Sequence, residues 1–377
     1  MPKTKASSQR KQKSKFIPYA TGFKPPSESE QRKAISAKSL PKELEPNDSF
    51  FSPVPAPTSA DDWLAQYNEE GQTFTDFLEE NPWISSLKRK AAKQTFVSRG
   101  NSLPEKYPDG KIYLLPLGEF SCGSSPNFNI LVEYAQAFFC LPVDVLPGVP
   151  LESDEGSSSV HWVEARRPGS SLRSRKITRP QKFHLDSRHN DKSGKRQLQV
   201  NSILVNLKRN IPNDALCLIA LTMEDLYQAS NDLFVAGMAA GNHRVAVFSF
   251  YRYDPSMAFS IEHWWDTNKN ILVDEEERMK MIIQRSCKLL VHEVSHILGL
   301  DHCIFFSCCM NGSGHLKEDF SQSMHLCPVD LHKLHFLCGF DIIERYGKLL
   351  EFFEKYDLKE EGDWVKRRLE YLNEEHV

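Results

Sequence analysis

The segment His292-Glu293-Val294-Ser295-His296-Ile297-Leu298-Gly299-Leu300-Asp301-His302 decides how the rest of the chain is interpreted. Residues four apart on a helix project from one face, so His292 and His296 can hold a single metal ion. Gly299 can adopt the left-handed conformation that ends a helix, and the turn lets His302 reach the same ion. Three neutral imidazoles leave a fourth position open for water, which is typical of catalytic rather than structural zinc.

The residue after the first histidine, Glu293, suits a role in proton transfer. On a helix it is offset from His292 by about 100°, so it can contact a metal-bound water without binding the metal. We therefore expect Glu293 to be the general base. The simpler alternative is a helix whose histidines lie in the core or on the surface and bind no metal.

A long helix is predicted to carry these residues. Asp274 followed by Glu277 resembles a capping box that begins the helix, and Gly299 is expected to end it. Its apolar residues recur at helical spacing and give it one buried side: Met279, Ile282, Ile283, Leu289 and Leu290.

Cysteines gather directly behind the histidines. Five of the nine lie within 36 residues, at positions 303, 308, 309, 327 and 338. The odd total argues against a complete set of disulfides. Cys303, Cys308 and Cys327 have the spacing of a closed structural zinc site that needs a fourth ligand.

The fourth ligand is left open by the sequence. Asp330 stands three residues after Cys327, where the second cysteine of a Cys-x2-Cys knuckle would be, and it is the ligand we favour. The alternatives are Cys309, Cys338, His332 and His335, or a cluster of buried thiols without a metal. Met310 is either an ordinary core residue or an apolar floor beneath the catalytic metal.

The hydrophobic pattern predicts the organisation of the chain. Residues 1–60 hold nine of the 22 prolines and neither Trp nor Cys, so we expect a disordered basic tail. Residues 61–350 are expected to form one α/β (α+β) domain, which begins with helices over 61–93 and continues with a mixed sheet. Strands are predicted at 112–117, 143–146, 215–222, 234–239 and 245–250, helices at 130–139 and 200–207, and a charged C-terminal helix at 351–377.

Charge is distributed unevenly along the chain. Residues 1–24 contain seven Lys or Arg and no acid, and residues 166–196 contain eleven against two acids, so the net charge of −3 conceals an acidic remainder of −19. We expect residues 151–196 to be a disordered basic insertion. Aromatic residues do not interleave with these bases, so nucleic-acid binding is not favoured.

The sequence contains neither a signal-peptide pattern nor an apolar run long enough to span a membrane. We therefore expect an intracellular protein, in the cytoplasm, the nucleus or both. Its oligomeric state cannot be read from the sequence.

The string His292-Glu293-x2-His296-x2-Gly299-x2-His302-Cys303-x4-Cys308-x-Met310, continued by Cys327-Pro328, resembles the archaemetzincins, which are zinc metallopeptidases of the metzincin clan. The similarity extends from about Asp61 to Tyr346 and is greatest to the vertebrate type-two branch. It includes Asp61-Asp62-Trp63, the stretch from Phe248 to Tyr253, Arg285-Ser286-Cys287-Lys288, Gly339-Phe340 and Glu344-Arg345-Tyr346.

The resemblance implies a metzincin fold, with a twisted sheet whose antiparallel edge strand pairs with an extended peptide. It implies that His292, His296 and His302 bind the catalytic zinc, that Glu293 is the general base, and that Met310 belongs to a methionine turn. Cys303, Cys308 and Cys327 would hold a second zinc, and the departure from the family pattern at Asp330 leaves the fourth ligand in doubt.

The resulting hypothesis is a zinc-dependent protease that hydrolyses peptide bonds with two zinc ions per chain, one catalytic and one structural. Its partners would be peptide or protein substrates, bound along an edge strand that we place at Phe234–Ala239. The alternative is a zinc-stabilised binding protein with the same fold and little or no protease activity.

Overall fold

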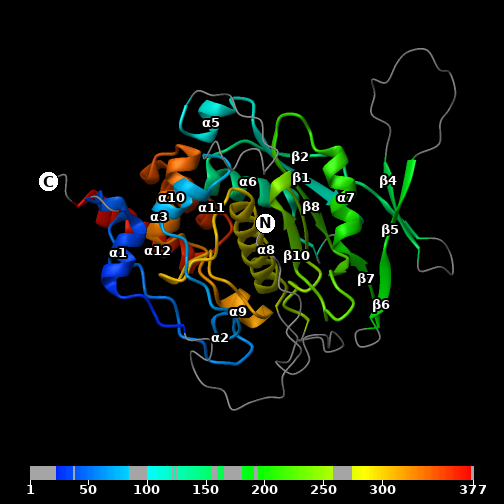
Figure 1. Ribbon diagram of the computed structural model, residues 1–377, viewed down its shortest axis with the longest axis horizontal. Helices are drawn as coiled ribbons and strands as arrows, with labels where there is room; N and C mark the ends of the chain where they lie inside the picture. The colour runs from blue at the N-terminus through cyan, green and yellow to red at the C-terminus, as the bar shows by residue number, and fades with distance from the viewer. Residues whose placement is uncertain are drawn as a thin grey trace.

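A five-stranded sheet forms the centre of the chain, shown in Figure 1 as a computed structural model. The structure describes residues 23–36, 39–84, 100–120, 123, 125–153, 159–164, 181–190, 194–257 and 274–374. The strand order is β10-β11-β8-β1-β2, and every pairing is parallel except that of β10 with β11. The strands are β1 (Lys111–Leu117), β2 (Val143–Val145), β8 (Ala215–Thr222), β10 (Gly237–Ala240) and β11 (Val245–Ser249).

Helices cover both faces of this sheet, and strand alternation divides its side chains between them. Ile219 of β8 and its neighbours of the same orientation pack with α6 (Phe128–Phe139) and α8 (Glu275–Ile297). Leu218 and Ala220 point the other way, toward α7 (Val200–Asn210). The predicted strand at 215–222 is confirmed as β8, and all eight of its residues are buried, so it is covered on both faces.

The predicted helix with the histidines is α8. The Asp274 carboxylate caps its first turn by accepting hydrogen bonds from the backbone N–H groups of Glu276 and Glu277. Gly299 follows its C-terminus with a φ of +92°, so the predicted glycine stop is confirmed. Of the five apolar residues predicted to face the core, four are buried and Met279 is half-buried.

The C-terminal part is helical, but its predicted boundary is wrong. The helices are α9 (Leu316–Ser321), α10 (Pro328–Cys338), α11 (Ile342–Lys355) and α12 (Lys359–Asn373). The expected start of a separate charged helix at residue 351 falls inside α11, because Leu349, Phe352 and Phe353 form one continuous buried stripe on that helix. Glu351, Glu354 and Lys355 are exposed on its solvent face. Helix α12 packs against α11.

The expectation that residues 1–60 are disordered is wrong for the described part of that range. Ser27 caps α1 (Glu28–Ile35) with a capping box, and Ala34 and Ile35 are fully buried. The prediction counted only the apolar surface that the segment has by itself. It did not include the helices about 300 residues away that cover this surface. Helix α1 packs on α10, and Phe51 contacts Trp364 of α12.

Part of the expected disordered insertion at 151–196 is also ordered. It contributes β3 (Leu151–Ser153), β4 (Val160–Glu164), β5 (Gln181–Leu185), β6 (Ser187–Asn190) and β7 (Lys195–Gln199), and β7 pairs with β9 (Asp225–Tyr227). Figure 1 shows β4 and β5 extending away from the central sheet. Trp162 and Leu185 are buried against the α7 side of that sheet, which supplies the apolar contact that composition alone did not suggest.

The edge strand was predicted at Phe234–Ala239 and lies at Gly237–Ala240, as β10. It begins later because Val235 forms a bridge with Leu226 of β9 and leaves the central sheet. At Gly237 the backbone passes so close to Phe248 that a Cβ atom would lie 2.1 Å from its ring. The predicted antiparallel edge of a mixed sheet is confirmed.

Short helices follow α1 along the chain: η1 (Lys42–Leu44), α2 (Trp63–Gln66), α3 (Phe74–Glu80) and α5 (Leu103–Lys106). The end of the predicted 61–93 helical region and the Arg-rich centre of the insertion lie outside the described residues. In the part of the chain that the structure describes, no helix has both the length and the apolar character that crossing a membrane requires.

Truncation of Ile35 tests whether the N-terminal segment is part of the fold. Because its side chain is 0% exposed, Ile35→Ala is expected to lower the free energy of unfolding by about 2–5 kcal/mol. Lys33→Ala, at an exposed position of the same helix, should change it by less than about 0.5 kcal/mol. Urea denaturation of both variants checks this, and equal effects would show that α1 does not pack in solution.

Candidate metal centres

Two side chains that follow α3, those of Asn81 and Trp83, cap the C-terminal end of α8. The backbone carbonyls of Ile297 and Leu298, in the last turn, accept hydrogen bonds from Trp83 Nε1 at 3.0 Å and Asn81 Nδ2 at 2.7 Å. Unpaired carbonyls at a helix end need such partners when they are buried. A Cβ atom on Gly299 would lie 2.4 Å from Asn81 Nδ2. Only glycine therefore permits both the left-handed turn and this close approach.

The turn brings the three predicted histidines together. One ring nitrogen each from His292, His296 and His302 lies within 4.8 Å of the others. The Nε2 atoms of His292 and His296 are 3.0 Å apart, near the separation of about 3.3 Å expected for two ligands of one tetrahedral zinc. The spacing in the sequence thus predicted this convergence.

The other ring nitrogen of each histidine has a hydrogen-bond acceptor. Nδ1 of His292 lies 2.7 Å from the Cys309 carbonyl, and Nδ1 of His296 lies 2.6 Å from the Leu300 carbonyl. Nδ1 of His302 is 3.0 Å from Glu69 Oε1. Protons on the Nδ1 atoms leave the three Nε2 lone pairs facing one point, so the group fits a cation.

Electrostatics favour the same state. Burial, followed by the nearby His296 and His302, holds the pKa of His292 well below its usual value. Burial and then His302 lower the pKa of His296 to about 4. Both imidazoles are thus neutral near pH 7, which is the form that binds metals.

Glu293 shares this buried environment. Burial is the main cause that raises the pKa of Glu293 to about 8, and the charge of Asp319 in α9 adds to it. A metal ion beside the carboxylate would oppose this shift, because it stabilises the ionised form. In the metal-free protein, Glu293 is therefore protonated at neutral pH.

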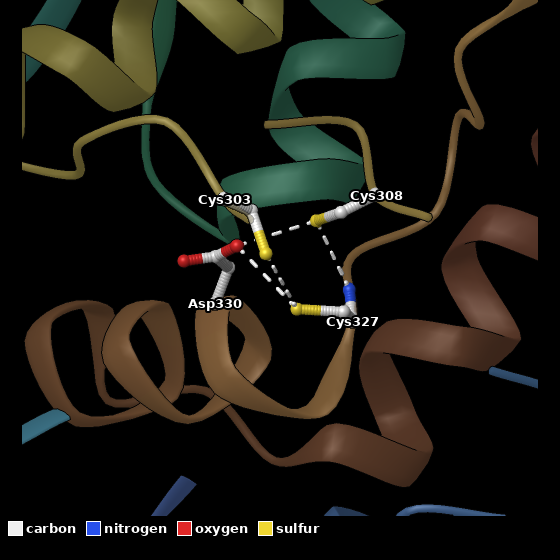
Figure 2. Close-up of side chains that lie close together, drawn as sticks. All are labelled: Cys303, Cys308, Cys327 and Asp330. Carbon is white, nitrogen blue, oxygen red and sulfur yellow. Dashed lines mark hydrogen bonds between the residues drawn. The ribbon is translucent and has the colours of Figure 1, made fainter. Parts of the chain in front are cut away.

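The second predicted group also assembles (Figure 2). Asp330 Oδ2 lies 3.3 Å from Cys308 Sγ and 3.4 Å from Cys327 Sγ, and the sulfur atoms of Cys303 and Cys327 are 3.6 Å apart. All four residues are buried. Cys303 and Cys308 come from the loop after α8, while Cys327 and Asp330 come from the start of α10.

The other candidates for the fourth position lie in different contacts. His332 Nδ1 is 2.7 Å from the Ile35 carbonyl, and His335 Nδ1 is 2.7 Å from the Phe340 carbonyl. Cys309 and Cys338 are buried in the core, and burial raises the pKa of Cys309 to about 12. Among the described residues, only Asp330 joins the three cysteines as a candidate ligand.

Lys333 is a functional candidate that the sequence interpretation missed. Its Nζ lies 2.9 Å from Asp330 Oδ1, with the lysine side chain 1% and the aspartate side chain 0% exposed. Asp330 therefore directs one oxygen to the cysteines and the other to Lys333. The spacing of three residues was the signal that could have identified this pair, because residues three apart on a helix such as α10 are neighbours.

Met310 is fully buried, and its carbonyl accepts a hydrogen bond from Cys303 N–H at 2.7 Å. This bond joins the two ends of the loop that carries Cys303 and Cys308. The methionine therefore closes the loop that carries the two cysteines. Its role as an apolar floor beneath the catalytic metal stays a prediction.

Comparison with known proteins shows similarity to peptidases. Residues 195–335 match the sequence model of Peptidase family M54. The chain is 29% identical over 347 residues to Archaemetzincin-2 of Rattus norvegicus, covering 87% of this chain and 82% of that protein. It is 31% identical over 302 residues to Archaemetzincin-1 of Homo sapiens, covering 75% of this chain and 54% of that protein.

Among solved structures, the chain is similar to an archaemetzincin from Methanopyrus kandleri, with 21% identity and a TM-score of 0.36, over 63% of this chain and 97% of that one. The family match and the curated relatives place the chain among the metallopeptidases, a class of hydrolases whose substrates are peptides or proteins. Residues 195–335 resemble peptidase family M54, and the chain resembles the archaemetzincins over most of its length, as the sequence motif predicted.

The pKa of Glu293 predicts how the stability of the metal-free protein depends on pH. The folded state holds this proton up to about pH 8, whereas the unfolded state releases it near pH 4.5. Stability contributed by the protonated carboxyl is fully present below pH 4.5 and is lost as the pH rises toward 8. The loss is about 1.4 kcal/mol for each pH unit in which only the folded state keeps the proton.

Glu293→Gln lacks this proton, so the variant should gain stability relative to wild type between pH 5 and pH 8. Urea denaturation of both proteins in the presence of a chelator measures the difference. A difference that does not change with pH would contradict the assignment of a raised pKa.

Proposed function

We propose that this protein is a zinc-dependent peptidase in which His292, His296 and His302 hold the catalytic zinc and Glu293 is the general base. The observation that carries the proposal is the convergence of three imidazole nitrogens, with their opposite ring nitrogens already paired. A closed structural site would have a fourth protein ligand. Among the described residues no fourth protein ligand joins the three histidines, which suits a hydrolytic reaction instead.

The residues of the site divide the reaction between them. Zinc bound there would supply a Lewis acid that lowers the pKa of water and polarises the scissile carbonyl. Glu293 takes a proton from the attacking water, whose oxygen forms a bond to the carbonyl carbon. The carboxylic acid then gives that proton to the leaving nitrogen as the C–N bond breaks.

The edge strand β10 offers a place for the substrate. Among the described residues it is the last strand of the central sheet and pairs only with β11, and its own residues are half-buried. An extended peptide can add to such an edge through backbone hydrogen bonds. The strand contacts α8, which carries Glu293. Docking along β10 thus places a peptide beside the helix of the reacting groups.

We also propose a second, structural zinc held by Cys303, Cys308, Cys327 and Asp330. The site is closed and buried, and four protein atoms are in reach of one ion. Asp330 replaces a thiolate by a carboxylate oxygen, which also ligates zinc. The pairing of its second oxygen with Lys333 directs the first toward the sulfurs and offsets part of the negative charge of the ligand set.

Substitution of Glu293 tests the catalytic role. Glu293→Gln should lower peptide turnover by about 10²–10⁴-fold because the amide cannot accept the proton, while the zinc content stays that of wild type. Cleavage of a library of unstructured synthetic peptides, followed by mass spectrometry, provides the assay. Unchanged peptide turnover in this variant would contradict the assignment of Glu293 as the general base. A zinc-loaded wild type that cleaves no peptide would favour the non-catalytic binding role.

Metal content tests the two sites separately. Wild type should contain two zinc ions per chain, and His296→Ala and Asp330→Ala should each retain one. Asp330→Cys supplies a thiolate at the same position and is expected to keep both ions. Because Asp330→Ala leaves the buried Lys333 charge unpaired, the double variant with Lys333→Met is the control for folding. Two ions in Asp330→Ala would remove Asp330 from the ligand set.

A further inference from the structure

The three histidines differ in what orients them. His292 and His296 use backbone carbonyls from the neighbouring loop, at Cys309 and Leu300. His302 instead uses the carboxylate of Glu69, which is 233 positions away in the sequence. Residue 69 also lies outside the part of the chain that matches the peptidase family model. The third histidine therefore depends on a segment that the matched domain does not contain.

Residues before and after Glu69 in the sequence make contacts that hold its backbone in place. On one side, Trp63 lies edge-on to His302 with ring centroids 4.8 Å apart, and its backbone N–H donates to Glu318 Oε2 at 2.9 Å. On the other side, Gln72 Nε2 donates to the Gly299 carbonyl at 3.2 Å. The segment is thus attached to the turn after α8 and to α9, with Glu69 between the two attachments.

The loop after Met310 is shaped to receive this segment. A Cβ atom on Gly312 would lie 2.3 Å from the indole of Trp63, and one on Gly314 would lie 2.1 Å from the Asp61 carbonyl oxygen. His315 Nε2 is 2.8 Å from Asp62 Oδ1, and Glu318 Oε2 accepts from Gly314 N–H at 2.6 Å. These contacts hold the backbone at residues 61–63, a few positions before Glu69 in the sequence.

We infer that Glu69 is a positioning residue of the metal centre. It orients His302 for zinc and thereby makes the segment 61–72 part of the active site. This inference rests on the proposed function. Glu69 Oε1 is 3.0 Å from His302 Nδ1, and Oε2 is buried without a hydrogen-bond partner among the described residues. His302 is thus the hydrogen-bonding partner toward which this carboxylate is directed.

The physical effect follows from the tautomer. A carboxylate at Nδ1 holds the proton there, so Nε2 keeps its lone pair, and the ring cannot rotate away without breaking the bond. It also makes the imidazole a stronger donor to a cation. Loss of such a partner typically weakens metal binding by about 10–100-fold.

Zinc affinity measures this effect independently of peptide turnover. Competition with a chromophoric chelator should reveal one binding event in wild type that His302→Ala lacks. For that event, Glu69→Ala is expected to raise the dissociation constant about 10–100-fold. Glu69→Gln, whose amide oxygen can still accept from Nδ1, should recover most of the affinity. Glu70→Ala changes the exposed neighbouring acid and should bind as wild type does.

The outcomes separate the hypotheses. Wild-type affinity in Glu69→Ala, or equal weakening in Glu69→Gln and Glu69→Ala, overturns the orienting role. Retention of the ion at the cysteine site in each variant controls for folding. If wild type and His302→Ala bind the same number of zinc ions, the proposed catalytic zinc site is wrong, and this inference is wrong as well.

Discussion

The turn at Gly299 is the constraint on which the rest of the site depends. A left-handed φ of +92° ends α8, and the absence of a Cβ lets Asn81 reach the Leu298 carbonyl at the end of the helix. Without this turn the helix would carry the chain away, and His302 could not return to the other two histidines. The same turn sets the start of the loop with Cys303 and Cys308, so both metal groups take their geometry from one backbone conformation.

The two groups are joined by sequence as well as by structure. His302 and Cys303 are adjacent, so a displacement of one moves the other through a single peptide unit. The carbonyl of Cys309 orients His292, while Cys308 beside it points into the second group. The buried cysteine group therefore does more than fill the core, because its loop supplies the acceptor that fixes a histidine of the first group.

Local patterns in the sequence predicted the features that depend on neighbouring residues. The apolar run of β8, the cap at Asp274 and the His-x3-His-x5-His spacing each indicate their structure within a short window. The N-terminal segment escaped prediction because its apolar contacts are supplied by α10 and α12. Glu69 escaped it for the same reason. A single glutamate near an aromatic pair has no local pattern that points to a histidine 233 positions later.

The dependence of both ends of the chain on one another has a consequence for biosynthesis. Gln31 bonds to the Phe305 carbonyl and Arg368 to the Glu43 carbonyl, across 274 and 325 positions of sequence. At roughly 5–20 residues per second, the ribosome delivers His302 on the order of ten to fifty seconds after Glu69. During that interval α10, on which α1 packs, has not yet been synthesised. The apolar side of α1 is thus exposed to chaperones and proteases until synthesis is almost complete, and the metal centre can form only as a late event.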